Sequence, residues 1–206
     1  MADDTIIDFP KKLQNLPLGS FGTLLLILLA AVMLISSVYT VDPEEVGVVL
    51  RFGEFVKTTE PGLHFKIPLG IDQVMKVARE RQLKLEFGFR TVEAGVRSTF
   101  RQVEDEALML TGDLNTAVVE WVVQYRIEDP EKYLFRVRNV TDTLRDISEA
   151  VMREVVGDRT VNEVLTVGRQ EIADLVEQRI QALCEEYETG IAIDQVVLQD
   201  VNPPDA

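Results

Sequence analysis

The chain has little of the chemistry that builds metal and redox sites: its 206 residues include a single cysteine, Cys184, and a single histidine, His64. One cysteine excludes an intrachain disulfide and is compatible with a reducing or an oxidising compartment. Zinc and di-metal centres normally draw on several His and Cys ligands, so the sequence predicts no metal site. No predicted helix N-terminus or histidine lies near Cys184 to lower its pKa, and we interpret it as a buried, unreactive side chain.

Positive charge is also scarce, with 21 Lys and Arg against 35 Asp and Glu and a formal net charge of −14. A chain this acidic repels phosphate backbones, and it contains no basic stripe, so we expect no binding to nucleic acid. Anionic lipid headgroups should repel it too. Any attachment to a membrane must therefore come from apolar burial.

Catalytic signatures are missing as well. The sequence contains no phosphate-binding loop, no Gly-x-Gly-x-x-Gly, no Gly-x-Ser-x-Gly and no His-Glu-x-x-His. His64 falls in a predicted strand without a Ser, Cys or Asp constellation, so we interpret it as an exposed or hydrogen-bonded strand residue. The sequence predicts no catalytic, cofactor-binding or metal-binding residues and a protein that is not an enzyme. An enzyme of unrecognised type, with a titratable cluster around His64 or the carboxylates, is the alternative.

The sequence contains one long apolar run, and no charged residue occurs between Lys12 and Asp42. At about 1.5 Å per residue, the stretch from Phe21 to Tyr39 approaches the ~30 Å thickness of the hydrocarbon layer. It predicts a transmembrane helix over residues 18–41, preceded by a short tail over residues 1–17. The predicted anchor side chains are Phe21, Leu24, Leu25, Leu26, Ile27, Leu28, Leu29, Val32, Met33, Leu34, Ile35, Val38 and Tyr39.

Two other interpretations of this run are a buried core helix and a cleaved signal peptide. The apolar core of a signal peptide is usually about 7–15 residues, and this run is longer, which favours an uncleaved signal-anchor. Lys11 and Lys12 precede the run, whereas acidic residues follow it before the first cation. The positive-inside tendency therefore places the N-terminus in the cytoplasm and the domain of residues 42–206 outside.

Alternating apolar residues predict several strands in this domain. Val46, Val48, Leu50 and Phe52 share one face of the first strand, and further strands are predicted over 63–67, 82–89, 107–110 and 191–201. The clearest pattern lies over 116–127, where one face carries Ala117, Val119, Trp121, Val123, Tyr125 and Ile127. The polar stretch 91–105 shows no periodicity and is predicted to be a mobile loop.

A helical period then replaces the alternation. Asp129-Pro130 is an N-cap followed by a proline at the first helical position, and it predicts a helix to about Val137. Leu144, Ile147, Val151 and Val155 form the stripe of a second helix. A capping box at Thr160–Glu163 begins a long third helix that ends at Gly190. This order predicts an α+β domain with antiparallel strands, then helices packed on one face, then a final strand.

Three arginines on or near these helices, Arg145, Arg153 and Arg169, are candidates for a subunit interface. The alternative is pairing within their own helices, with acidic partners such as Asp146, Glu149, Glu154 or Glu177.

Several motifs resemble a known family. The apolar run followed by residues 41–49 (VDPEEVGVV), Arg51-Phe52-Gly53 and residues 61–64 (PGLH) resembles the opening of the stomatin/prohibitin/flotillin/HflK-C, or SPFH (band 7), family. Later blocks narrow the resemblance to its HflK branch: residues 87–90, 106–113, 123–126, 129–134, 143–146, 165–169 and 198–204. The resemblance covers residues 40–206.

This resemblance implies a bacterial inner-membrane protein with its bulk in the periplasm and no active site. It implies assembly with an HflC-like subunit into a large hetero-oligomer, seated on the bilayer, that regulates the membrane AAA+ protease FtsH. Family members continue into a long charged helix that this chain lacks, so closure of such an assembly is left open. The alternative within the family is a stomatin- or prohibitin-like module that organises membrane or modulates a channel.

Overall fold

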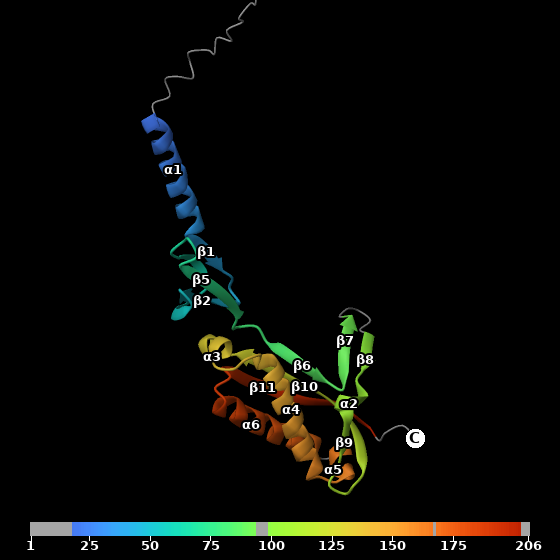
Figure 1. The fold of residues 1–206 in the computed structure, drawn as a ribbon. Coiled ribbons are helices and arrows are strands. Elements are labelled where there is room, and N and C mark those ends of the chain that lie inside the picture. Colours follow the sequence, from blue (N-terminus) through green and yellow to red (C-terminus); the bar gives the residue numbers. More distant parts are fainter. Residues whose placement is uncertain (1–17, 94–98, 167, 203–206) are drawn as a thin grey trace, which may run out of the picture.

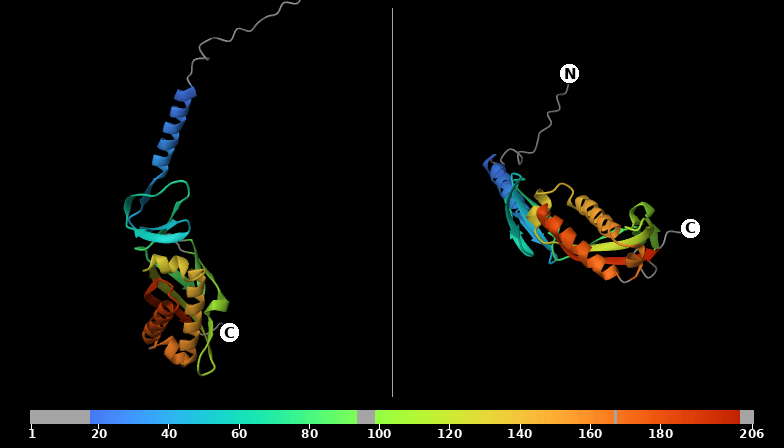
Figure 2. Two further views of the ribbon diagram at one scale, coloured as in Figure 1. Left: turned by 60° about the vertical axis from the view of Figure 1, so that its left-hand side comes forward. Right: turned by 90° about the horizontal axis from the view of Figure 1, so that it is seen from below.

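The computed structural model describes residues 18–93, 99–166 and 168–202 and has an elongated α+β architecture (Figure 1). Helix α1 (Leu18–Ser36) is followed by a small β lobe, here called the proximal lobe, made of β1 (Val38–Val41), β2 (Glu45–Arg51), β3 (Glu54–Thr59), β4 (Gly62–Phe65) and β5 (Asp72–Ala78). The rest of the chain forms a larger distal lobe. The two further views in Figure 2 show the same order of helix, proximal lobe and distal lobe.

Helix α1 ends earlier than the predicted boundary at residue 41. The Ser37 hydroxyl donates to the Met33 carbonyl at 2.7 Å, and Val38 and Tyr39 already lie in β1, paired with Phe65 and His64 of β4. This local β pairing of branched and aromatic residues outweighs continuation of the helix. Within the described part of the chain, no helix is both long and apolar enough to cross a membrane. The predicted span is therefore not confirmed, and the predicted tail over residues 1–17 lies outside the described residues.

The proximal lobe contains a three-stranded antiparallel sheet in the order β3-β2-β5 and the β1-β4 pair. Val46, Val48 and Leu50 are buried as the alternation predicts. Phe52 is not: it lies in the two-residue turn between β2 and β3, with φ 51° beside Gly53 at φ 89°, and its side chain is 81% exposed. Two positive φ angles match the twist of a tight hairpin, so turn geometry overrides the alternating pattern here.

The distal lobe is built on a four-stranded antiparallel sheet of β6 (Leu83–Phe87), β9 (Leu108–Leu110), β10 (Thr116–Ile127) and β11 (Ile191–Asn202). Strand β10 is central: it pairs with β11 on one side and with β6 and β9 on the other. All six predicted inward residues of β10 are buried. Five of them share a core with α4 (Val140–Gly157) and α6 (Arg169–Glu186), whereas Ile127 packs with Val46, Val48 and Leu50 of the proximal lobe. Both helices cover the same face of the sheet (Figure 1), so the predicted α+β arrangement is confirmed.

The predicted N-terminal caps agree with the structure, whereas the predicted long third helix has a break and ends at Glu186, where Glu188 (φ 51°) and not Gly190 is the first left-handed residue after the helix. Asp129 accepts from the Glu131 and Lys132 amides at the start of α3 (Pro130–Phe135), and the capping box at Thr160 is formed. The predicted long third helix is divided into α5 (Val161–Leu165) and α6. At the break, the Gly168 amide donates to the Glu163 carbonyl at 3.0 Å. A Cβ at Gly168 would lie 2.7 Å from that carbonyl oxygen, so the close turn requires glycine.

The predicted loop over 91–105 is also corrected. Strands β7 (Phe89–Glu93) and β8 (Thr99–Gln102) form an antiparallel ribbon, which is followed by the short helix α2 (Glu104–Ala107). The predicted strand 82–89 is divided at Gly88, whose φ of 81° turns the chain from β6 into β7. A ribbon whose two strands mainly contact each other needs no strict apolar alternation, which is why the sequence pattern did not reveal it.

Candidate membrane-facing and assembly surfaces

The first surface is helix α1. Its described side chains from Leu24 to Ile35 are apolar and, apart from half-buried Met33, exposed, so they are not covered by the other residues that the structure describes. The predicted anchor residues Leu24–Leu29, Val32, Leu34 and Ile35 all belong to this exposed set. Val38 and Tyr39 instead belong to β1, and the side chain of Phe21 lies outside the described ones. A large aliphatic side chain that stays in water lacks the stabilisation of about 1.5–3 kcal/mol that burial would provide. A row of such side chains therefore requires an apolar environment.

A second apolar surface, which no sequence pattern revealed, lies on the proximal lobe and is here called the apolar rim. It consists of Phe52, Leu63, Phe65, Ile67 and Leu69, which are all exposed. The rim begins beside the end of α1, because the Lys66 amide donates to the Ser37 carbonyl at 2.7 Å. It continues to the β2–β3 turn, where the Phe52 amide donates to the Ile71 carbonyl at 3.0 Å. The apolar surface of the helix is thus continued on the lobe that follows it.

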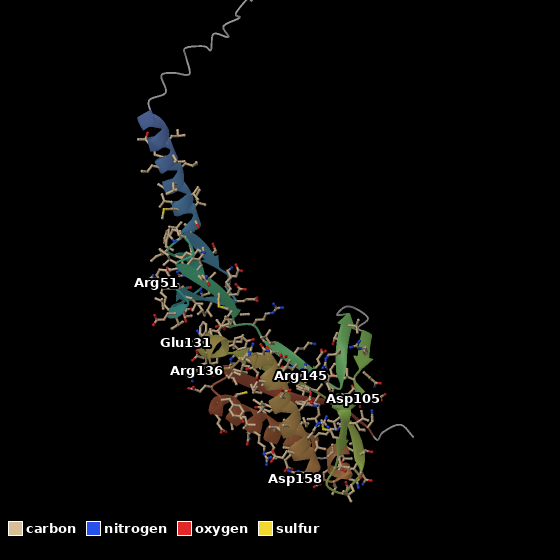
Figure 3. All side chains as sticks on the ribbon, in the orientation of Figure 1. Arg51, Asp105, Glu131, Arg136, Arg145 and Asp158 are labelled. Carbon is tan, nitrogen blue, oxygen red and sulfur yellow. The ribbon has the colours of Figure 1, made fainter. Side chains whose placement is uncertain are left out.

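An ion pair holds this turn in place. The Arg51 Nε donates to Asp72 Oδ1 at 2.9 Å, and the Asp72 carboxylate also accepts from the Ile67 amide at 2.9 Å. The hydrogen bond from Arg51, followed by that from Ile67, lowers the pKa of Asp72 below its ordinary value. Figure 3 shows Arg51 on the proximal lobe below α1. The rim is therefore carried by a fixed segment of backbone.

His64 lies in a strand and is hydrogen-bonded, and Cys184 lies in the core of the distal lobe. His64 Nε2 lies 2.6 Å from the Glu60 carbonyl, and its ring lies beside Tyr39 with the centroids 5.6 Å apart. This agrees with the predicted hydrogen-bonded strand histidine. Cys184 is buried, and burial raises the pKa of its thiol, which disfavours the nucleophilic thiolate. Among the residues that the structure describes, no three His, Cys, Asp or Glu side chains are grouped to hold a metal ion.

A hollow of about 580 Å³ lies between the two lobes. Thr58, Glu60 and Arg79 line it from the proximal side, and Lys132, Cys184 and Glu188 are among its residues on the distal side. His64 is not part of the lining, and Glu188 lies 3.8 Å from Lys132 in an ion pair. The lining combines residues of both lobes, so the hollow marks their junction.

The three arginines proposed for a subunit interface each bind backbone of their own chain. Arg145 donates to the Glu86 carbonyl at 3.1 Å, and Arg169 donates to the Val201 carbonyl at 3.2 Å. Arg153 donates to two carbonyls, those of Asp105 and Leu108, each at 3.1 Å. Their role at an interface stays a prediction.

Two other arginines near these helices form ion pairs outside their own helix. Arg179 of α6 pairs with Glu154 of α4 at 2.7 Å, and Arg159, which lies between α4 and α5, pairs with Glu171 of α6 at 2.7 Å. These ion pairs stabilise the helical layer rather than single helices.

Comparison with known proteins gives one consistent result. The family model described as SPFH domain / Band 7 family matches residues 39–206. "Protein HflK" of Treponema pallidum (strain Nichols) is 39% identical over 189 residues, which are 90% of this chain and 57% of the relative. "Protein HflK" of Borreliella burgdorferi is 32% identical, covering 94% of this chain and 62% of the relative. "Modulator of FtsH protease HflK" of Escherichia coli (strain K12) is 35% identical over 89% of this chain and 40% of the relative. The chain thus spans roughly two fifths to three fifths of the length of these relatives.

Proposed function

The chain belongs to the SPFH domain / Band 7 family, and on this premise we propose that it is a membrane-anchored, HflK-like scaffold subunit without an active site of its own. The observation that carries this proposal is the apolar surface that covers α1 and continues into the apolar rim. In this proposal α1 (residues 18–36) provides the anchor, residues 1–17 a short tail, and residues 37–206 the extramembrane domain.

The proposed anchoring rests on the exposed apolar side chains of α1, which require an apolar environment. The apolar rim then lies at the bilayer surface, where exposed aromatic and aliphatic side chains are favourable. The net charge of −14 opposes contact with anionic headgroups, so apolar burial provides the attachment.

The proposed orientation places the N-terminus in the cytoplasm and the domain on the extracytoplasmic side of a bacterial inner membrane. Lys11 and Lys12 before the helix, and Asp42, Glu44 and Glu45 after it, support this direction. An alkaline phosphatase fusion after Ala206 tests it. High phosphatase activity is expected, because that enzyme is active only outside the cytoplasm. An inactive fusion that is present in normal amount contradicts the orientation.

The proposed partners are an HflC-like subunit and an FtsH-like protease. The printed name of the Escherichia coli relative, a modulator of FtsH protease, supports the second partner. Anchoring confines neighbouring domains to two dimensions and raises their effective concentration, so weak lateral contacts suffice for a hetero-oligomer. In this arrangement the subunit regulates a protease by surrounding or positioning it, and it contributes no proteolytic chemistry.

The test is co-purification of the full chain from bacterial membranes in mild detergent, with and without an HflC-like subunit. We expect a large assembly that retains an FtsH-like protease. A monomer in both preparations contradicts the scaffold. A stomatin- or prohibitin-like role predicts a channel or lipid as the main co-purifying partner in place of the protease. The enzyme alternative predicts a hydrolytic activity of the isolated chain that His64→Ala abolishes.

A further inference from the structure

The β7–β8 ribbon stands out from the distal lobe. Figure 1 shows the two strands projecting from the side of the lobe, away from the α4 and α6 layer. Isolated two-stranded ribbons are marginally stable in water, so such a projection needs support at its base or a partner along its length. Val92 in β7 is 62% exposed, and Arg101 in β8 is exposed with no carboxylate partner among the described residues. These two side chains are available to a neighbouring molecule.

The base of the ribbon is held by a set of residues that we call the clamp: Glu86, Arg90, Glu106 and Arg145. Arg90 Nη2 lies 2.5 Å from Glu106 Oε1, and Arg90 Nη1 donates to the Glu86 carbonyl at 2.7 Å. Arg145 of α4 donates to the same carbonyl at 3.1 Å and lies 3.7 Å from Glu106. Two arginines from different elements thus converge on one carbonyl and one carboxylate.

The clamp is also attached to the core. The Arg145 guanidinium lies 4.8 Å from the centroid of the Phe87 ring, which stacks on Trp121 at 3.9 Å. Figure 3 shows Arg145 where α4 approaches β6. A cation over a stacked aromatic pair, with one hydrogen-bonded carbonyl and one paired carboxylate, has little freedom to reorient. The ribbon therefore leaves the core in one fixed direction.

The charge of the ribbon is opposite to that of the chain. Residues 89–102 contain three arginines and one glutamate, whereas the whole chain has a net charge of −14. The outer surfaces of α4 and α6 carry exposed acids: Asp142, Asp146, Asp174 and Glu186. Arg90 and Arg101 lie directly opposite each other in the ribbon register. Because Glu106 neutralises Arg90, Arg101 is left to attract an external carboxylate.

We propose that the β7–β8 ribbon is a contact arm that binds the acidic helical surface of a neighbouring copy of this domain, with Arg145 as the residue that positions it. This proposal rests on the proposed scaffold function and names the surface through which its subunits meet. Arg145 acts on assembly through the direction of the ribbon and does not touch the neighbour. Val92 and Arg101 make the contact.

The test uses the full chain in detergent and measures its self-association by light scattering. Arg101→Glu and Val92→Asp should each weaken self-association at least tenfold. Arg138→Glu makes the same change of charge at an exposed residue of the α3–α4 corner and should alter self-association less than twofold. Fluorescence of Trp121, the only tryptophan, reports whether each variant keeps its core.

A second measurement separates positioning from contact. A dye on Gln102→Cys accepts energy from Trp121 and reports the direction of the ribbon. Arg145→Gln should change this transfer and weaken self-association about fivefold, while Arg145→Lys, which keeps the charge, should recover part of both. Loss of association by Arg145→Gln with unchanged energy transfer would overturn the positioning role.

Failure of the arm and failure of the scaffold are distinguishable. If the wild-type chain associates and the Arg101 and Val92 variants associate equally well, the ribbon is not the contact, although the scaffold function stands. If the wild-type chain remains monomeric, alone and with an HflC-like subunit, the scaffold function fails and the arm fails with it.

Discussion

Gly88 is the residue at which the chain turns from β6 into the ribbon, and it offers a sharp test of the close packing there. Its φ is 81°, and a Cβ would lie 2.9 Å from the Ala107 Cβ and 3.2 Å from the Glu120 Cγ. A non-glycine residue in the left-handed region costs about 1–2 kcal/mol. Overpacking typically adds about 1–3 kcal/mol. Gly88→Ala should therefore reduce the free energy of unfolding by about 2–5 kcal/mol.

Thermal unfolding followed by circular dichroism measures this loss. For a domain of this size, the expected decrease in melting temperature is about 5–15 °C. Gly53→Ala is the matched control, because Gly53 has φ 89° but no atom within 4 Å of the position that a Cβ would occupy, so only the backbone cost applies. If Gly88→Ala lowers the stability no more than Gly53→Ala does, the close approach of α2 and β10 to Gly88 is refuted.

Three further predictions concern acid stability, anchoring and the core. The folded-state pKa of Asp72 lies below its unfolded value, so its stabilisation is present above the unfolded pKa and is lost as pH falls through the folded pKa. Asp72→Asn should reduce the decrease of the melting temperature as the pH is lowered. The same decrease as in the wild-type chain would contradict this. Leu28→Arg places a charge near the middle of α1 at a cost of about 2.5–3.5 kcal/mol in a bilayer, and it should increase the unsedimented fraction of the chain, whereas Leu28→Ile should not. Leu144→Ala removes a fully buried side chain and should lower the free energy of unfolding by about 2–5 kcal/mol, against little change for the exposed Thr166→Ala.

The parts of the fold that the sequence predicts are those in which one physical effect dominates. The period-two pattern of β10 is set by burial, mainly against α4 and α6 and, for Ile127, against the proximal lobe, and all its inward residues are buried. The caps at Asp129 and Thr160 depend only on side chains close in sequence, and both are formed. Short-range contacts of the capping side chains and burial on a single face allow few alternative structures. The sequence therefore predicts these elements correctly.

The remaining features depend on local backbone geometry or on residues far apart in the sequence. The exposure of Phe52 follows from the tight turn, and the break before α6 follows from the approach of Gly168 to Glu163, and neither is visible in a periodicity of apolar residues. The clamp joins Arg90, Glu106 and Arg145, which are far apart in the sequence. The apolar rim likewise forms only when β4 pairs with β1 at the end of α1. The clamp and the rim therefore require tertiary contacts that a one-dimensional pattern does not contain.

The charge of the chain gives the contact arm a distinctive dependence on salt. Two chains of net charge −14 repel each other over a screening length of about 30 Å at 0.01 M salt but only about 10 Å at 0.1 M. A contact between Arg101 and a carboxylate is shorter than either length and weakens mainly towards 1 M salt, where the screening length is about 3 Å. Self-association should therefore be strongest near 0.1 M and weaker at both extremes.

Light scattering of the full chain across this range of salt distinguishes ionic from purely apolar contact. Arg101→Glu should remove the decrease between 0.1 M and 1 M, because the attractive pair is lost while the repulsion remains. Arg138→Glu should keep the maximum, since it adds to the repulsion without removing the pair. Association of the wild-type chain that strengthens steadily up to 1 M salt would show that repulsion is the only important charge effect, and the ionic part of the ribbon contact would be refuted.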